Sequence, residues 1–249
     1  GADVLVVKAD RVKNWGRFLS AAGRAGYRLV GRNARVAVLR LEAPAVPGAN
    51  DFGTRVCWEG LAVGKYAPNF ALMFPKLRLG DSIYLDDYSE GELLRQRVLV
   101  LSGFAWRDRA KAERLAARAA AGGVRVVVDL TGVPADVRSG RPEFLGVSAE
   151  PMTFVEESPP LNADGEILAP VRLPEGYRRW STHYLLGLDR ASVTLRYRGA
   201  TVAAAGEAGG AVFVGANLPF LAFLTRDPEV TALLERCVGL RAGDPPERS

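Results

Sequence analysis

The fold is decided by the stretch RVLVLSGFAWRDRAKAERLAARAAAGGVRVVVDLTG, residues 97–132. RVLVLSGF and VRVVVDLTG are nearly continuous apolar runs of strand length, and the segment between them predicts a helix that ends at Gly122 and Gly123. The helix has apolar residues at core spacing, namely Ala110, Leu115, Ala116 and Ala119. Strands that are apolar on both faces and are joined by such a helix form a right-handed parallel βαβ unit. The stretch therefore predicts an α/β fold.

The chain before this unit contains a Pro- and Gly-rich linker, which we interpret as a domain boundary. Residues 1–45 predict a small β-α-β-β unit, because DVLVV reads as a strand, RVKNWGRFLSAAGRAG as an amphipathic helix and YRLVGRNARVAVLRLE as a hairpin. The linker is APAVPGANDFG, with residues 46–53 as its core. Residues 54–240 then form the larger α/β domain, and 241–249 a flexible tail.

The larger domain is less regular on either side of the βαβ unit. TRVCWEGLAV predicts a strand, and residues 64–96 predict a long connection with an extended piece near SIYLDD. The segments SVTLRYRG, ATVAAAGEA and GAVFVGA predict a meander of three strands. AVFVGANLPFLAFLT fits a strand followed by a loop, and DPEVTALLERCVGL fits a closing helix with Asp227 as its N-cap.

Composition limits the chemistry. The 249 residues carry a net charge of +5 with both signs mixed along the chain, so a nucleic-acid partner is disfavoured. One histidine, His183, and two cysteines, Cys57 and Cys237, cannot build a Cys/His zinc cluster, and we expect neither a metal nor a cofactor. The cysteines could form a disulfide, but their apolar surroundings favour two buried thiols.

The residues VLVLSGFAWRDRAKAERLAARAAAGGVRVVVDLTG, together with GATVAAAGEAGGAVFVGANLPFLAF and LLERCVGL, resemble the class I glutamine amidotransferase-like fold. The resemblance covers about Thr54 to Leu240. It is closest to non-catalytic branches, such as the domain that mediates trimerisation in some β-galactosidases. It implies a flavodoxin-like three-layer sheet for the larger domain.

A narrower resemblance rests on YLDDYSEGELLRQRVLVLSGFAWRDRAKAERLA and on VVVDLTGVPAD with PEFLGVSAEPMTF. These residues are similar to the extracytoplasmic C-terminal region of bacterial multi-spanning membrane proteins that carry a 6-pyruvoyl-tetrahydropterin synthase-related label. The resemblance implies a place at the cell membrane, on its extracytoplasmic face, with the protein's own membrane-embedded region as a partner. It also implies surface glycan handling with a carbohydrate ligand, and no pterin chemistry.

The amidotransferase mechanism itself is not expected. In a working amidotransferase, the strand that matches VRVVVD leads into a Cys nucleophile elbow, which a late His-x-Glu pair activates. Here the matching positions hold Asp129, Leu130, Thr131 and Gly132, and the one histidine is followed by Tyr184 and Leu185. We therefore predict no catalytic residue.

A ligand crevice remains possible, because ligands of open α/β sheets bind at the carboxyl ends of the strands. The candidate lining residues are Ser102, Trp106, Arg107, Asp129, Thr131, Asp86 and Asp87. Each has a structural alternative: Asp129 could cap a turn, Trp106 could cover the sheet edge, and Asp86 with Asp87 could form a solvated loop. A hydrolase that pairs Asp129 with Asp86 or Asp87 is the rival function.

The segment RRWSTHY, residues 178–184, concentrates aromatic, basic and hydroxyl groups. It could be a ligand or partner loop, or an ordinary interface with the N-terminal unit. We interpret His183 as an ordinary hydrogen-bonded histidine.

Overall fold

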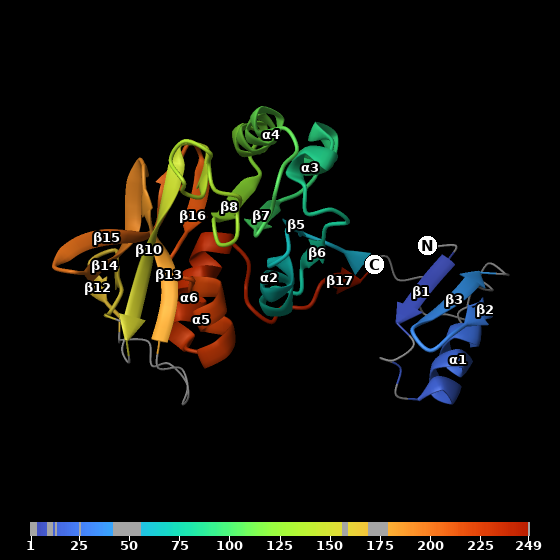
Figure 1. The fold of residues 1–249 in the computed structure, drawn as a ribbon. Coiled ribbons are helices and arrows are strands. Elements are labelled where there is room, and N and C mark those ends of the chain that lie inside the picture. Colours follow the sequence, from blue (N-terminus) through green and yellow to red (C-terminus); the bar gives the residue numbers. More distant parts are fainter. Residues whose placement is uncertain are drawn as a thin grey trace. The chain divides into compact units, whose positions relative to one another are not determined.

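The structure is a computed structural model that describes residues 4–8, 12, 14–24, 26–41, 56–155, 159–168 and 179–248. The chain divides into two compact units, Gly1–Val56 with Arg248–Ser249, and Cys57–Glu247 (Figure 1). The linker predicted at Ala43–Gly53 lies outside the described residues.

The first unit is a helix packed on a small antiparallel sheet. Its elements are β1 (Val4–Lys8), α1 (Trp15–Arg24), β2 (Tyr27–Arg32) and β3 (Val36–Leu41), and the strand order is β1-β3-β2. Ala37 and Leu39 of the central strand are fully buried, and Trp15 and Phe18 of the helix pack against them. The observed order is the β-α-β-β expected from the sequence.

The rest of the described chain alternates strands and helices. Its elements are β4 (Val56–Cys57), β5 (Gly60–Val63), α2 (Ala67–Met73), β6 (Leu77–Leu79), the 3-10 helix η3 (Leu85–Asp87), α3 (Glu90–Leu94), β7 (Val98–Ser102), α4 (Arg109–Ala121), β8 (Arg125–Asp129), β9 (Glu143–Phe144), β10 (Val147–Val155), β11 (Asn162–Ala163), β12 (Glu166–Ile167), β13 (Arg179–Leu186), β14 (Arg190–Tyr197), β15 (Ala200–Ala208), β16 (Ala211–Val214), α5 (Leu218–Thr225), α6 (Pro228–Val238) and β17 (Glu247–Arg248). The short strands β4 and β17 pair with each other.

One large mixed sheet organises this unit, which makes the fold α/β. Its path runs β12-β11-β14-β15-β16-β8-β7-β5-β6, and β10, with β9 beside it, joins through β13, which pairs with β15. The pairs among β6, β5, β7, β8 and β16 are parallel. From β16 onwards the pairs are antiparallel. The carboxyl ends of five neighbouring strands therefore lie at one edge of the sheet.

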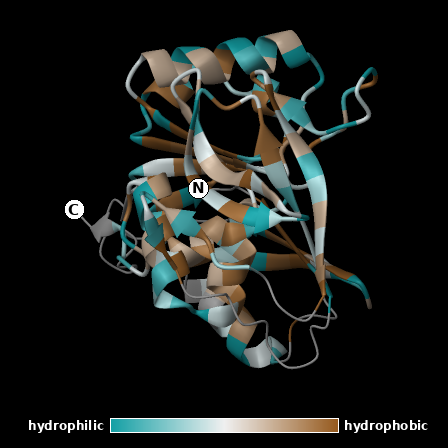
Figure 2. Ribbon diagram, turned by 90° about the vertical axis from the view of Figure 1, so that its left-hand side faces the viewer, coloured by the Kyte–Doolittle hydropathy of each residue, from teal (hydrophilic) through white to brown (hydrophobic). Residues whose placement is uncertain are grey.

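Helices cover both faces of the parallel half (Figure 1). On β7, Leu99 and Leu101 belong to the cluster that contains the buried face of α4, whereas Val98 and Val100 belong to the cluster of α2, α5 and α6. Because successive side chains of a strand point to opposite faces, a strand covered on both faces must be apolar throughout. The central strands are accordingly hydrophobic along their length (Figure 2).

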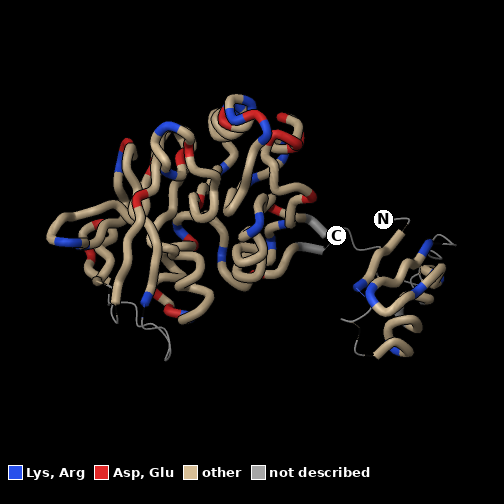
Figure 3. Tube along the Cα trace, in the orientation of Figure 1, with Lys and Arg blue, Asp and Glu red and all other residues tan. Residues whose placement is uncertain are grey.

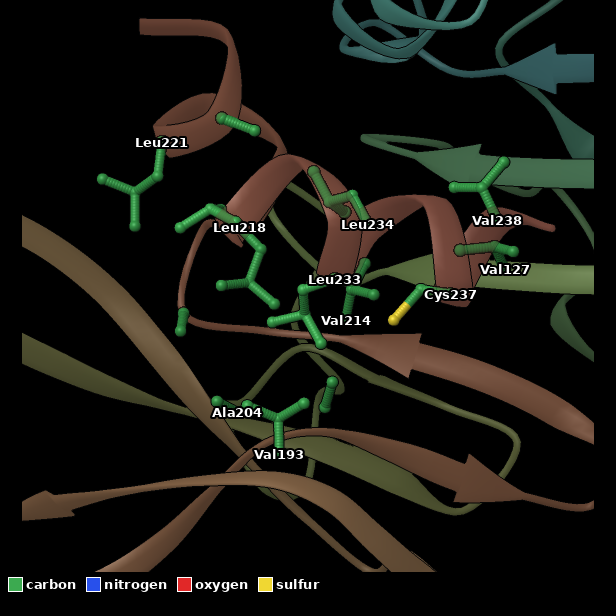
Figure 4. Close-up of a cluster of buried hydrophobic side chains, with 14 of the residues drawn as sticks. Val127, Val193, Ala204, Val214, Leu218, Leu221, Leu233, Leu234, Cys237 and Val238 are labelled. Carbon is green, nitrogen blue, oxygen red and sulfur yellow. The ribbon is translucent and has the colours of Figure 1, made fainter. Parts of the chain in front are cut away.

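The helices α5 and α6 fill the second face together. Leu218 and Leu221 of α5, Leu233 of α6 and Val214 of the sheet all belong to this cluster (Figure 4). Asp227 caps α6 by accepting hydrogen bonds from the backbone N–H groups of two residues in its first turn, as the sequence predicts.

Cys237 on α6 lies in the same cluster, and its thiol is free and buried (Figure 4). This agrees with the expectation of a buried thiol. Cys57 lies in β4, and its side chain is outside the described part of the chain.

Several segments differ from the sequence-based expectations. Residues 64–96, expected as a long connection, contain α2, β6, η3 and α3. The expected loop after β16 is the helix α5, whose LPFLAFLT sequence is apolar on nearly all sides; Leu218 and Leu221 are buried, whereas Phe223 is exposed. In α4 the fourth buried residue is Ala112, and Ala110 is exposed. The RRWSTHY segment is not a loop: its described residues 179–184 begin β13, with Trp180 and His183 buried.

Charged residues of both signs are interspersed on the surface of the larger unit, as on α3 and α4 (Figure 3). Arg118 of α4, for example, pairs with Glu90 of α3 at 3.3 Å. Among the described residues, no helix has the length and apolar character needed to cross a membrane.

Candidate functional site

The candidate site forms where parallel strands end side by side. Ser102, the last residue of β7, is in register with Asp129, the last residue of β8, and Asp129 is in register with Val214, the last residue of β16. The loops that follow these strands, and the loop after β5, meet at this edge. Ligands of open α/β sheets bind at such an edge.

Asp129 is a buried carboxylate at the centre of the site, and its exposed fraction is 3%. The Ser102 hydroxyl donates a hydrogen bond to Oδ2 at 2.6 Å, and the Thr131 backbone N–H donates to Oδ1 at 2.9 Å. A buried charge needs such donors, because burial without them is costly. The two bonds hold the carboxylate plane in one orientation. The turn-capping role considered from the sequence is therefore present, and it coexists with a place in a pocket wall.

A pocket of about 230 Å³ adjoins this carboxylate. Its lining residues with a polar group are Tyr66, Asn69, Ser102, Asp129, Thr131 and Asn217. The Tyr66 backbone N–H donates to the Ser102 carbonyl at 3.1 Å, which fixes the loop after β5 against the end of β7. The side-chain amide of Asn69 has no hydrogen-bond partner within the described residues and can serve a ligand.

Lys65 lies across the same edge. A side chain at Gly132 would come within 3.0 Å of its ammonium nitrogen, and one at Gly103 would meet its carbon stem. Both glycines have positive φ, which L side chains rarely adopt. The ammonium lies 5.1 Å from the centroid of the Tyr66 ring and pairs with no carboxylate in the described part of the chain.

A second pocket, of about 370 Å³, lies on the other side of Thr131 and Asn217, which line both pockets. Thr182 and His183 of β13 contribute to its wall. His183 Nε2, Thr131 Oγ1 and Thr182 Oγ1 are buried, and none has a hydrogen-bond partner within the described residues. This corrects the interpretation of His183 as an ordinary hydrogen-bonded histidine, because its Nε2 has no hydrogen-bond partner within the described residues.

Burial lowers the pKa of His183 below its ordinary value of 6.5, and the negative charge of Asp129 only partly counters this effect. The imidazole is therefore neutral at neutral pH. It offers one donor and one acceptor and carries no charge.

Asn217 joins the two pockets on a strained piece of backbone. Ala216 and Asn217 both have positive φ, 52° and 49°, at the junction between β16 and α5. The Ala216 N–H donates to the His183 carbonyl at 2.8 Å, which ties this junction to β13. The Asn217 side chain does not cap α5 and has no partner among the residues described. Such strain concentrates at functional sites.

The other predicted lining residues lie elsewhere. Both oxygens of Asp86 accept from the Arg107 backbone N–H, at 3.0 and 3.2 Å, and Oδ2 also accepts from the Asp108 N–H at 3.0 Å. Asp87 forms an ion pair with Arg107 and accepts from the Ser82 hydroxyl at 2.6 Å. These contacts fix the loop before α4.

Trp106 stacks on Phe144 with ring centroids 5.7 Å apart, and it covers the end of the sheet on the α4 side. The Arg107 guanidinium lies 4.1 Å above the Tyr84 ring. The structure thus brings Ser102, Asp129 and Thr131 together and places Asp86, Asp87, Trp106 and Arg107 in a separate cluster. Asp129 is the one carboxylate among the described residues that line the 230 Å³ pocket.

No group of three or more His, Cys, Asp and Glu side chains is arranged to hold a metal ion in the described part of the chain. The site is built from one carboxylate, neutral hydroxyl and amide groups and aromatic rings, with the Lys65 ammonium at its edge. This set can orient a hydroxylated ligand through hydrogen bonds.

Sequence reasoning missed Tyr66, Asn69, Asn217 and the site contribution of His183. A signal was available for three of them. GKYAPN follows a buried strand and has Pro68 in the first turn of a helix, and Asn217 follows the strand AVFV. Both are strand–turn–helix patterns whose turns lie at the carboxyl end of a strand.

The comparison with protein families gives one match: the family described as Domain of unknown function (DUF8560) matches residues 59–221. Neither the curated proteins nor the solved structures contain a match to the chain. The matched residues cover well over half of the chain and include all the lining residues named for both pockets. The chain therefore belongs to the family described as Domain of unknown function (DUF8560).

Proposed function

We propose that the chain is a non-catalytic accessory domain that binds a carbohydrate on the extracytoplasmic face of a bacterial membrane protein. The observation that carries the proposal is the buried, doubly hydrogen-bonded Asp129 in the wall of a pocket at the carboxyl edge of the parallel strands. A carboxylate held in one orientation is suited to accept hydrogen bonds from ligand hydroxyl groups.

The strand order supports a flavodoxin-like assignment of the parallel half. Numbered in chain order, β6-β5-β7-β8-β16 is 2-1-3-4-5, which is the order of flavodoxin-like sheets. In such sheets the switch point lies between strands 1 and 3, here β5 and β7. The 230 Å³ pocket draws Tyr66 from the loop after β5 and Ser102 from the end of β7, so it lies at this point.

The chemistry of the site supports binding over catalysis. The position of the amidotransferase nucleophile holds the turn that follows Asp129, and Thr131 Oγ1 has no basic partner in the described residues. A nucleophile needs a base within hydrogen-bond reach. The Asp129 carboxylate already accepts a hydrogen bond from Ser102. The second carboxylate of the rival hydrolase would be Asp86 or Asp87, and both of these bind the segment before α4.

The groups around Asp129 support a carbohydrate as the ligand. Sugars present hydroxyl groups at their edges and an apolar face, so their sites combine carboxylate and amide groups with aromatic rings. Asn69 and Asn217 supply amides, and Tyr66 supplies a ring that is 38% exposed. The proposed location of the chain, on the extracytoplasmic face of a bacterial membrane protein, rests on the sequence resemblance.

An NMR titration tests ligand binding. Methyl glycosides of glucose, galactose, mannose and N-acetylglucosamine are added to the labelled chain of residues 1–249. We expect saturable shifts at Tyr66, Thr131 and Asn217 with at least one sugar, and loss of these shifts in Asp129→Asn. The matched control is Asp189→Asn, since Asp189 also accepts a backbone hydrogen bond but lies outside the pocket. Absence of saturable shifts with all four sugars would contradict the proposal.

The membrane location is tested on the whole gene. Hydropathy of the sequence upstream of Gly1 should show several spans of about 20 apolar residues. An upstream sequence without such spans would contradict this part of the proposal and leave the ligand-binding part standing.

A further inference from the structure

The two pockets meet at Thr131 and Asn217, which line both. Ligand pockets in proteins measure about 300–1,000 Å³. The pocket beside Asp129, about 230 Å³, is below this range, and its neighbour of about 370 Å³ is near the lower end of the range. Because the two pockets share Thr131 and Asn217, we treat them as two parts of one site and call the part beside Asp129 the carboxylate pocket and the part beside His183 the histidine pocket.

The histidine pocket contains polar atoms without partners. Thr182 Oγ1 and His183 Nε2 are buried, and within the described residues neither makes a hydrogen bond. The exposed fraction of His183 is 8%, so water has little access to its ring. Unpaired buried polar groups are rare in native proteins, because each forfeits its hydrogen bonds to water. A ligand group that forms these hydrogen bonds gains more binding free energy than it would from polar groups that are already hydrogen-bonded within the protein.

Apart from Ser181, the rest of the histidine pocket wall consists of apolar residues and one paired guanidinium. Leu130, Ala149 and Pro151 supply apolar surface. The Arg141 guanidinium, which also lines the pocket, pairs with Glu150 at 2.7 Å. With a neutral imidazole beside it, this wall fits an uncharged group that has hydroxyl or amide functions and an apolar face.

Asn217 is placed to contact both halves of an extended ligand. Its amide is unpaired within the described part of the chain, and its left-handed backbone is held by the bond between the Ala216 N–H and the His183 carbonyl. The hydroxyl of Thr131, also without a partner there, lies at the same border.

We infer that the site binds an oligosaccharide of at least two units, with one sugar in the carboxylate pocket and the next in the histidine pocket, bridged by Thr131 and Asn217. The inference rests on the proposed function and adds the length of the ligand. Thr182 then distinguishes a disaccharide from a monosaccharide, because it lines the histidine pocket and is absent from the lining of the carboxylate pocket.

The test compares methyl glycosides of glucose, galactose, mannose and N-acetylglucosamine with their β-1,4-linked disaccharides by calorimetry and NMR on the full chain. For the preferred sugar, the disaccharide should bind about tenfold more tightly than the monosaccharide, as one or two added hydrogen bonds predict. Thr182→Val should remove that gain in affinity and leave monosaccharide affinity unchanged. Ser102→Ala should lower the affinity for both ligands.

The melting temperature of Thr182→Val shows whether this variant is folded. Valine has the shape of threonine without the hydroxyl, so replacing a buried, unpaired hydroxyl should leave the melting temperature unchanged or raise it. Asn217→Gly should also lower the affinity for the disaccharide, because glycine keeps the left-handed backbone conformation and removes the side-chain amide. The control is Thr194→Val on β14, outside both pockets, which should change neither affinity.

The outcomes separate the two proposals. Equal affinity for mono- and disaccharides, or a Thr182→Val variant that keeps the disaccharide gain, overturns the two-part site; monosaccharide binding that depends on Ser102 then leaves the proposed function intact. Absence of binding by every sugar overturns both.

Discussion

The Ser102 hydroxyl donates a hydrogen bond of 2.6 Å to the Asp129 carboxylate across two neighbouring parallel strands. Both residues are buried, with exposed fractions of 1% and 3%. The bond therefore has two effects: it stabilises this edge of the sheet, and it fixes the orientation of the carboxylate in the candidate site.

Ser102→Ala should lower the free energy of unfolding by about 1–3 kcal/mol, because a buried carboxylate oxygen loses its donor. Urea unfolding measures the change. Ser139→Ala, at an exposed position in the loop after β8, is the control and should stay within about 0.5 kcal/mol of the wild type. Equal stabilities for Ser102→Ala and wild type would show that Asp129 does not need this donor.

Gly64 allows the loop after β5 to approach the end of β7. Its φ is 120°, and a Cβ there would lie 2.2 Å from the Ser102 carbonyl oxygen. Gly64→Ala should therefore destabilise the protein by at least about 2 kcal/mol more than Gly123→Ala. Gly123 also has positive φ, but a Cβ at that position would meet no other atom within 4 Å, so the pair separates steric contact from backbone strain. Thermal unfolding of both variants gives the comparison, and similar losses would contradict the close approach.

The βαβ unit was predictable because its two central strands are apolar on both faces. Val98–Ser102 is buried at every residue, and such a run is recognisable without knowing its neighbours. The helix α5 was not recognisable from periodicity, because LPFLAFLT is apolar on nearly all sides and shows little helical alternation.

The site was predictable only in part. Ser102, Asp129 and Thr131 follow from the expected strand ends, and the structure brings them together. Asn217 belongs to the site because β16 pairs in parallel with β8, although residues 130–210 separate the two strands. Residue patterns within one strand contain no information about such strand order. They also do not show that Asp86 and Asp87 bind the segment before α4.

Arg109 connects α4 to the chain that follows β8. Its guanidinium contacts Glu113 at 2.9 Å, Asp136 at 2.8 Å and Glu143 at 2.9 Å. Arg109→Lys should lower the free energy of unfolding by about 1–2 kcal/mol, because the three carboxylates contact three separate nitrogens of the planar guanidinium, and a compact ammonium cannot occupy all three positions. Arg118→Lys, with one exposed partner, should cost less than about 0.5 kcal/mol. Chemical denaturation tests this order, and a reversed order would refute it.

Cys237 should be chemically quiet in the folded protein. Burial raises the pKa of its thiol to about 11, and the nearby Arg125 and Arg236 only partly oppose this. In the Cys57→Ser variant at pH 8, the remaining thiol should react with a disulfide reagent on the order of 100-fold more slowly than after unfolding in urea. Fast reaction in the native state would show that α6 does not bury the sulfur.

His183 should make stability depend on pH near neutrality. Burial lowers its pKa below 6.5, so below about pH 6.5 the unfolded chain binds a proton that the folded chain does not. The free energy of unfolding should therefore fall as the pH falls from 6.5 towards the folded-state pKa, by up to about 1.4 kcal/mol per pH unit. His183→Gln lacks the titrating group and should show a smaller loss between pH 7.5 and 5.5 in urea titrations. Carboxylates other than Asp129 have the same surroundings in both proteins, so the difference reports on the imidazole and its interaction with Asp129. Parallel curves would mean that His183 accepts its proton in the folded state.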